Sequence, residues 1–563
     1  MVSFKTSLSI LGLAAYAQAA PTTSATNSSA NFSNSSIEWT KCPSTVSGQS
    51  GLPVECAQYG VPLDYTDEKC NETTLLNLIR VPATKQPSLG SILLNYGGPG
   101  EEAVSTTAQS SFVLNMLSGG RYDLVSFDPR ILRSGTTTTL PFTCFTSSFE
   151  QQRFVDNLSL APHPEDREAI GHLWAAAANI GQACAQAQNK TGSLIGTAFA
   201  ARDVVSIATA LGEKDKVRFW GFSYGTTLGA TLVSMFPEKI EGVILDGVQN
   251  PHEYYHADAD FEEWAQSDQV FSAIFQYCAK NADQCALSRR GNSSAELEKS
   301  YWSLYESLRY NPLPAGTTVL DHYALNQIAS NALYSPYSWP NFTAGVDMLM
   351  GPKKDYDMEF LADWTAQLQI TDDTTARAAQ QIIQSLAGIH CSDRVNRLSS
   401  LQEYMPVQQR LGNISRLMGP TEAPVAMICA QWQIDAKERY KGNFQVTPRK
   451  PVLLVGNSYD GHTPIVSARN VSSGFGGSIV LEVNGYGHAS LGLPSKCTVQ
   501  KYSDYWVNGT MPAPGTVCEV DYKPWSNISW PDVAKEIGWP VPGAQSAVSG
   551  SPSVVSRMIA ARL

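Results

Sequence analysis

Short β-branched apolar runs recur along this chain, and they constrain its fold more than any other feature. Turn residues bound each run, and amphipathic stretches with helical spacing separate most of them: 91–95 (SILLN), 124–127 (LVSF), 217–221 (VRFWG), 242–245 (GVIL) and 452–455 (VLLV). Strands that are apolar throughout are buried on both faces, which requires helices on both sides of a sheet. The sequence therefore predicts an α/β fold with a mainly parallel sheet.

Roughly two hundred residues separate the fourth and fifth runs, far more than one crossover needs. This stretch has helical periodicity, with side chains that would share one helix face: Leu297, Tyr301, Leu304, Tyr305 and Leu308. We therefore expect a core in two parts, 39–250 and 406–540, split by an inserted helical lid subdomain over 251–405.

A G-x-S-x-G motif, Gly221 to Gly225, directly follows the third run and precedes an amphipathic stretch. A nucleophilic serine on a strand-to-helix turn needs small neighbours two residues away on either side, because the turn is strained and crowded. The helix N-terminus also places backbone N–H groups near the reacting oxygen. Ser223 is therefore the predicted nucleophile; the alternative is a glycine-rich turn with a serine cap.

Folds with this turn provide their catalytic residues in the order nucleophile, acid, histidine. The fifth run is followed by a turn that contains Asp460, the predicted acid. Of the eight histidines, His462 and His488 alone follow it in the chain. His462 is too close to Asp460 in sequence to be oriented by it across a site, so His488 is the predicted base by elimination.

A glycine-rich loop, 95–100 (NYGGPG), follows the first run. Consecutive glycines let backbone amides approach a developing oxyanion, and the proline stiffens the loop. We expect the N–H groups of Tyr224 and Gly98 to form the oxyanion hole. A generic tight turn is the alternative.

These segments form a set: GGPG, YDLVSFDPR at 122–130, GFSYG, the Asp460 loop with Thr463-Pro464, GYGHAS, ICAQW at 428–432 and the Cys497 to Cys518 stretch. The set resembles α/β-hydrolase-fold serine peptidases, in particular the secreted tripeptidyl aminopeptidase family, relatives of proline iminopeptidase. The resemblance extends from about Trp39 to about Trp530. It implies the α/β-hydrolase fold and an exopeptidase that releases tripeptides from free N-termini.

An aminopeptidase needs a carboxylate partner for the α-ammonium of its substrate. By position, the candidates are Glu101, Glu102, Glu262 and Glu263. The chain departs from its relatives where Arg130 is followed by Ile-Leu-Arg and where two glutamates follow GGPG. Both loops lie near the active-site mouth in that fold, so an esterase, lactonase or amidase with the same triad remains an alternative. A non-enzymatic binding protein on this scaffold is a more distant one.

Eleven cysteines indicate an oxidising compartment and leave one sulfur without an intramolecular partner. Two pairs flank short loops, Cys278 with Cys285 and Cys497 with Cys518. The resemblance implies three more pairs and leaves Cys70 free: Cys42 with Cys56, Cys144 with Cys184, and Cys391 with Cys429.

The first residues indicate export. Residues 1–19 read as a signal peptide, with Lys5, a short apolar run and small residues before the cleavage site. Residues 20–38 are predicted to be a flexible lead and residues 541–563 a loose tail. Asn-x-Ser/Thr glycosylation sequons occur along the expected mature chain, which favours a secreted glycoprotein, with a vacuolar enzyme as the alternative: Asn71, Asn157, Asn189, Asn292, Asn341, Asn413, Asn470, Asn508 and Asn527.

The formal net charge of −11 argues against a nucleic-acid partner, because phosphate contacts need clustered Lys and Arg. No apolar run is long enough for a membrane span. We find no zinc-site spacing and no dinucleotide-binding motif, so no metal or cofactor is implied. The expected partner is a peptide or a small-molecule substrate.

Overall fold

The computed structural model describes residues 37–542 with internal gaps. The residues outside the description are the two termini, 1–36 and 543–563, and the internal positions 131–132, 135–136, 139–141, 146, 148, 151–152, 155–164, 215, 316–317, 354–355, 358–359 and 362–383. The predicted signal peptide, almost all of the predicted lead and the predicted tail therefore lie outside the described residues.

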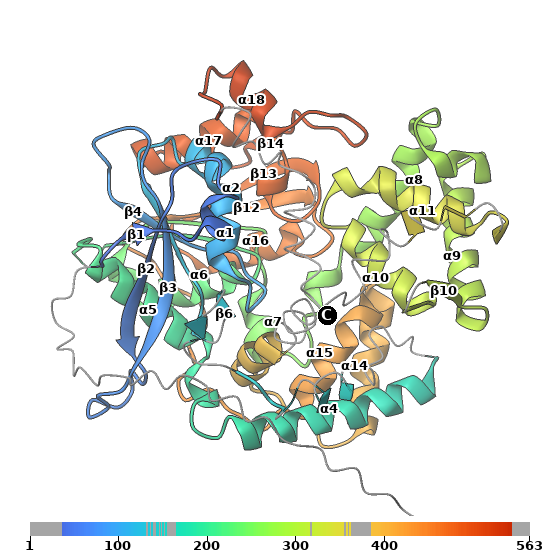
Figure 1. Cartoon of the computed structure of the whole chain (residues 1–563), viewed down its shortest axis with the longest axis horizontal. Helices are drawn as coiled ribbons and strands as arrows, with labels where there is room; N and C mark the ends of the chain where they lie inside the picture. The colour runs from blue at the N-terminus through green and yellow to red at the C-terminus, as the bar shows by residue number, and fades with distance from the viewer. Residues whose placement is uncertain are drawn as a thin grey trace, which may run out of the picture.

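A ten-stranded sheet runs through the described residues (Figure 1). In the spatial order given next, the pairings from β1 through β2 and β3 to β5 are antiparallel. Each pairing from β5 to β14 is parallel. In spatial order the strands are β1 (Thr40–Lys41), β2 (Glu55–Pro62), β3 (Thr73–Val81), β5 (Asp123–Phe127), β4 (Ser91–Asn95), β8 (Val217–Phe222), β9 (Ile240–Asp246), β12 (Val452–Tyr459), β13 (Ile479–Tyr486) and β14 (Val517–Glu519).

The predicted parallel sheet is confirmed, and each of the five apolar runs lies in one of its strands. The antiparallel edge, β1 to β3, was not predicted. In β3, buried and exposed residues alternate over the first half of the strand, so it lacks the continuous apolar run of the central strands. Such alternation is typical of a strand with one exposed face.

Helices cover both faces of the sheet, and successive strand residues point to opposite faces. On one face, Leu93 joins the apolar core with α5 (Thr197–Ala210), α6 (Tyr224–Met235) and α16 (Ile465–Gly474). On the other face, Ile92 and Leu94 pack with a second core, contributed by α2 (Ala103–Leu117), α17 (Lys496–Asn508) and α18 (Trp530–Glu536). Continuous apolar strands are therefore needed, because both of their faces are buried.

Between β9 and β12 lies the helical region, which Figure 1 shows beside the carboxyl-end edge of the central strands. Its helices are α7 (Pro251–His256), α8 (Ser267–Lys280), α9 (Ser294–Tyr310), α10 (His322–Ala332), α11 (Trp339–Leu349), α14 (Leu401–Ile414) and α15 (Gly419–Ala430). The hairpin β10 (Leu313–Ala315) and β11 (Thr318–Leu320) belongs to it as well.

The predicted lid boundary at residue 405 falls inside α14. Tyr404, Val407 and Leu411 are buried on one face of this helix, so its packing continues across the boundary. Tyr404 donates a hydrogen bond to the carbonyl of Ala423 in α15, at 3.4 Å. The helical region therefore extends to Ala430. A further helix, α4 (Arg167–Ala187), packs against α15, where Gln431 donates to the carbonyl of Trp174.

Shorter elements complete the described chain: α1 (Ser44–Ser47), β6 (Arg133–Ser134) and β7 (Thr137–Thr138). No helix in the described part of the chain combines the length and the apolar character that a membrane span requires.

Ten cysteines are paired in the described residues, in the same five pairs that the sequence and the resemblance indicated: Cys42–Cys56, Cys144–Cys184, Cys278–Cys285, Cys391–Cys429 and Cys497–Cys518. Cys70 is the free thiol among the described residues. Five disulfides are typical of proteins that reach an oxidising compartment.

Eight of the nine glycosylation candidates have exposed side chains, as an attached glycan requires: Asn71, Asn189, Asn292, Asn341, Asn413, Asn470, Asn508 and Asn527. Asn157 lies outside the described residues.

Candidate active site

Ser223 lies on the turn between β8 and α6 with φ 55° and ψ −130°, a backbone conformation that a non-glycine residue adopts only under constraint. The flanking glycines are required by contact. A Cβ on Gly221 would lie 2.2 Å from the carbonyl oxygen of Gly225, and a Cβ on Gly225 would lie 2.3 Å from that of Asn95. This is the strained strand-to-helix turn that the sequence predicts.

Asp460 follows β12 and is fully buried. Its carboxylate accepts hydrogen bonds from the backbone N–H groups of His462, Thr463 and Ala489, at 2.9, 2.9 and 3.0 Å. Burial raises the pKa of this carboxyl, but the charge of His488 and these hydrogen bonds outweigh burial and hold the pKa below its usual value. Asp460 is therefore a permanent carboxylate at neutral pH.

His488 follows β13, between Gly487 with φ 117° and Ala489 with φ 57°. Its Nδ1 lies 3.2 Å from Oδ2 of Asp460 and 3.0 Å from Oγ1 of Thr463. With Nδ1 directed at the carboxylate, the Nε2 atom is the one left to accept a proton. The geometry is that of a histidine oriented by an acid.

The sheet brings the three predicted residues to one edge. Ser223 follows β8, Asp460 follows β12 and His488 follows β13, and these strands are parallel with only β9 between β8 and β12. Carboxyl ends of parallel strands meet at the same edge of a sheet, where α/β proteins place their sites.

The glycine-rich loop after β4 runs directly past the serine. A Cβ on Gly97 would lie 2.8 Å from Cβ of Ser223 and 2.9 Å from the backbone nitrogen of Tyr224. Gly97 and Gly98 have φ of 105° and 99°, which favour glycine at both positions. The loop therefore lies beside the N-terminus of α6, as the predicted oxyanion hole of Gly98 and Tyr224 requires.

A pocket with about 580 Å³ of empty space, its open mouth included, begins at this loop. Gly98 and Pro99 line one part of it, and the helical region provides most of the remaining wall. Three buried carboxylates line the pocket: Asp260, Glu263 and Glu422. Clustered carboxylates in a pocket favour a ligand with a cationic group.

The four predicted amine-binding glutamates lie in different places. Only Glu263 lines the pocket, where it accepts a hydrogen bond from Gln249 at 2.8 Å. Glu262 instead accepts hydrogen bonds from Ser467 and Asn470 on α16. Glu101 and Glu102 are half-buried between the glycine-rich loop and α2. Burial, together with the charges of Glu102 and Asp128, raises the pKa of Glu101 to about 8.

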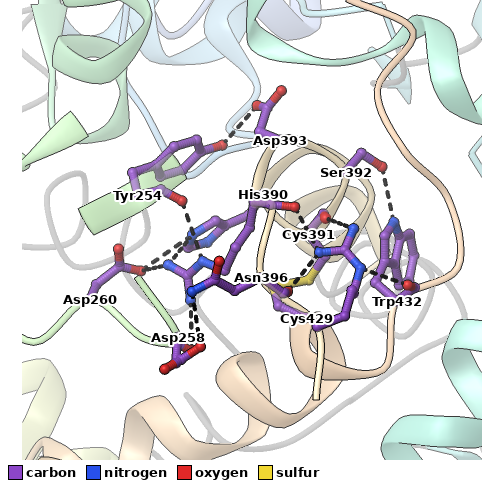
Figure 2. Close-up of a disulfide and its surroundings, with 12 residues drawn as sticks. Tyr254, Asp258, Asp260, His390, Cys391, Ser392, Asp393, Asn396, Cys429 and Trp432 are labelled. Atoms are coloured by element: carbon purple, nitrogen blue, oxygen red, sulfur yellow. Dashed lines mark hydrogen bonds and ion pairs between the residues drawn. A yellow bond between two sulfur atoms is a disulfide. The ribbon is translucent and has the colours of Figure 1, made fainter. Parts of the chain in front are cut away.

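The disulfide Cys391–Cys429 joins the helical residues 384–393 to α15, and both segments line the pocket (Figure 2). His390 in this wall stacks on the ring of Tyr254 at 4.3 Å between centroids. Arg394 donates to Asp260 at 2.8 Å, so the charge of that pocket carboxylate is balanced by a buried guanidinium.

Sequence reasoning missed three contributors to the site. Thr463 donates to Oδ2 of Asp460 at 2.9 Å. Its Thr-Pro motif was visible in the sequence, but the sequence assigned no function to the threonine. His462, rejected as the base, lies in the pocket wall with its ring 3.5 Å from that of Tyr334. The carbonyl of Tyr334 accepts from the backbone N–H of His488 at 2.8 Å. Tyr334 has no motif that could have revealed it.

Within the described residues, no group of three or more His, Cys, Asp or Glu side chains is arranged to hold a metal ion. Of the departure after Arg130, residues 131 and 132 lie outside the described residues.

Two family models match the chain. One is described as alpha/beta hydrolase fold and matches residues 90–334, and the other, described as TAP-like protein, matches residues 415–518. The first spans the glycine-rich loop and the serine turn, and the second spans the acid and the histidine.

Three curated relatives match over most of their length. The serine protease Hip1 of Mycobacterium tuberculosis is 28% identical over 509 residues, 86% of this chain and 91% of the relative. The tripeptidyl aminopeptidase of Streptomyces lividans is 24% identical, over 87% of this chain and 88% of the relative. Carboxylesterase B of M. tuberculosis is 25% identical, over 85% and 89%. The chain therefore belongs to the TAP-like family of α/β-hydrolases and is a serine hydrolase.

Proposed function

We propose that this protein is an exopeptidase that releases short peptides, mainly tripeptides, from free N-termini. The observation that carries the proposal is the pocket, since the oxyanion loop and a buried carboxylate, Glu263, line the same cavity. A substrate that fills it can place its carbonyl at the loop and its ammonium at the carboxylate.

In this mechanism Ser223 Oγ attacks the scissile carbonyl carbon and His488 Nε2 takes the serine proton. The oxyanion that forms is stabilised by the N–H groups of Gly98 and Tyr224. Collapse of the intermediate breaks the C–N bond, and the imidazolium gives its proton to the leaving amine. Water, deprotonated by His488, then hydrolyses the acyl-enzyme and releases the peptide. Asp460 orients the imidazole and stabilises its charged form.

The ammonium end explains why such an enzyme would act from the N-terminus. With the ammonium bound by Glu263, the distance from Glu263 to Ser223 limits how many residues can precede the cleaved bond. The names of two relatives, tripeptidyl aminopeptidase and serine protease, support a peptide substrate.

Secretion is part of this proposal. Five disulfides and eight exposed sequon asparagines support a route through an oxidising compartment that glycosylates proteins. A vacuolar destination uses the same route.

Mass-spectrometric analysis of a peptide library with free and acetylated N-termini tests the function. We expect short N-terminal fragments from the free peptides and none from the acetylated ones. A Ser223→Ala variant should release neither. Equal cleavage of free and acetylated peptides would refute the aminopeptidase assignment.

An esterase, lactonase or amidase that acts on a small metabolite is the second candidate. The carboxylesterase among the relatives favours it. Comparing a tripeptide amide with a short-chain ester separates the two. Hydrolysis of the ester alone would select this candidate over the peptidase.

A further inference from the structure

Asp246 is a buried carboxylate at the end of β9, between the strands that carry the serine and the acid. It pairs with Phe222 of β8 on one side and with Val455 of β12 on the other. Its side chain is fully buried. A buried carboxylate that stabilised the fold alone would be costly at this position, so its partners are informative.

Those partners are the nucleophile Ser223, a residue of the histidine loop and a tyrosine of α17. The carbonyl of Asp246 accepts from the backbone N–H of Ser223 at 3.2 Å. Its carboxylate accepts from the backbone N–H and Oγ of Ser490, at 2.9 and 2.7 Å, and from the hydroxyl of Tyr502 at 2.8 Å. Ser490 is two residues beyond His488. Asp246 is therefore hydrogen-bonded both to the nucleophile and to the loop that carries the base.

The loop that carries His488 needs such support. Ala489 has φ 57° and ψ 164°, a conformation that a non-glycine residue keeps only where its surroundings fix it. Asn457 donates to the carbonyls of Gly487 and Ala489, at 2.7 and 2.8 Å, and Asp460 accepts from the N–H of Ala489. Asp246 fixes the next residue, Ser490.

We propose that Asp246 is a positioning residue for His488: it holds the histidine loop in register with Ser223 and places a second negative charge next to that loop. This inference rests on the proposed role of His488 as the base. It deepens that function by adding a group outside the Ser-Asp-His set.

The charges around Asp246 fix the sign of the expected effect. Tyr502 faces it from α17, and because burial and the charge of Asp246 keep the pKa of this phenol well above its ordinary value, Tyr502 stays a neutral donor. Burial raises the pKa of Asp246 to about 6, against the hydrogen bonds from Ser490 and Tyr502 and the charge of His488. Above that pH the carboxylate attracts the imidazolium, which forms in the transition state.

The test is Asp246→Asn, which keeps the shape and lets both hydroxyls turn to accept. The readout is the rate of labelling by a fluorophosphonate probe across pH, which reports on Ser223 and His488 whatever the natural substrate. We expect the maximal labelling rate to fall roughly tenfold with the probe affinity unchanged, because a neutral side chain binds Ser490 more weakly than a carboxylate does and the histidine loop is then less firmly held. The acid limb of the profile should move to lower pH, because a neutral side chain no longer favours the imidazolium.

Asp393→Asn is the matched control. Asp393 is equally buried, accepts from the N–H of Thr197 and the hydroxyl of Tyr254, and also has its pKa raised by burial to about 6. It should lower the melting temperature without moving the acid limb. If Asp246→Asn does not fold, Ser490→Ala removes one bond to the carboxylate and should lower the labelling rate about threefold.

A wild-type labelling rate and profile in Asp246→Asn, or in Ser490→Ala where that is the variant tested, would overturn the inference and leave the proposed function standing. Absence of labelling at Ser223 in the wild-type protein would instead overturn the proposed function.

Discussion

Replacing Glu263 with glutamine tests how the pocket recognises a substrate amine. Glu263 is 4% exposed, lines the pocket and accepts a hydrogen bond from Gln249 at 2.8 Å. Glutamine has the same shape, and its amide oxygen can still accept from Gln249. The substitution therefore removes the negative charge and little else.

A charge-assisted hydrogen bond to an ammonium contributes about 1.5–3 kcal/mol. A loss of about 2 kcal/mol corresponds to a roughly 30-fold fall in kcat/KM. The ammonium is charged in both the ground state and the transition state, so most of the fall should appear as a higher KM. The assay compares one fluorogenic tripeptide with its N-acetylated form, for the wild type and for Glu263→Gln.

Glu262→Gln provides the control, because the neighbouring glutamate faces Ser467 and Asn470 on α16 rather than the pocket. It should retain wild-type kcat/KM. The reasoning is refuted if Glu263→Gln retains wild-type kcat/KM on the free tripeptide. An equal loss on the free and the acetylated substrate would refute it as well, because the loss would then not depend on the amine.

Three further predictions concern the oxyanion loop and the pocket wall. The pKa of Glu101 is raised from 4.5 to about 8. Its contribution to stability is therefore complete below pH 4.5 and is lost as pH rises through 8. Glu101→Gln should raise the melting temperature near pH 8 and leave it unchanged near pH 4.5. Gly97→Ala would place Cβ 2.8 Å from that of Ser223, so kcat should fall about 100-fold or more in a steady-state assay. Removing Cys391–Cys429, which closes a sequence separation of 38, should lower the free energy of unfolding by about 4 kcal/mol in denaturant titration and raise KM.

Each of the last two has a matched comparison. Gly509 also has positive φ, 66°, but no atom lies within 4 Å of an added Cβ, so Gly509→Ala should cost stability without a loss of kcat. Removing Cys497–Cys518, with a separation of 21, should cost about 3 kcal/mol and leave KM unchanged, because that pair lies away from the pocket. A raised KM in both disulfide variants would indicate a general effect of destabilisation.

Most of the sheet and the candidate triad could be predicted because both depend on local patterns. The central strands are buried on both faces, so each appears as a continuous apolar run. The glycines beside Ser223 are fixed by contacts within a few residues, such as that of Gly221 with Gly225. The order of the motifs along the chain then assigns Asp460 and His488.

The pocket wall could not be predicted, because it depends on contacts between distant segments. Glu263 and Glu422 are separated by 159 positions, and only tertiary packing within the helical region places both in one cavity. Nothing in the sequence distinguishes Glu263 from Glu262, since the direction of each side chain follows from a single turn of 3-10 helix, Glu262–Trp264. Asp246 ends an apolar run like any strand-ending aspartate, and only its hydrogen bonds reveal the connection to Ser490.

The hydrogen bond from the N–H of His488 to the carbonyl of Tyr334 has a consequence for how substrate enters. Tyr334 directly follows α10, so the helical region and the sheet share the loop that carries the histidine. A motion that separated Tyr334 from this loop would have to break the bond, so any opening of the helical region at α10 is coupled to the position of the base.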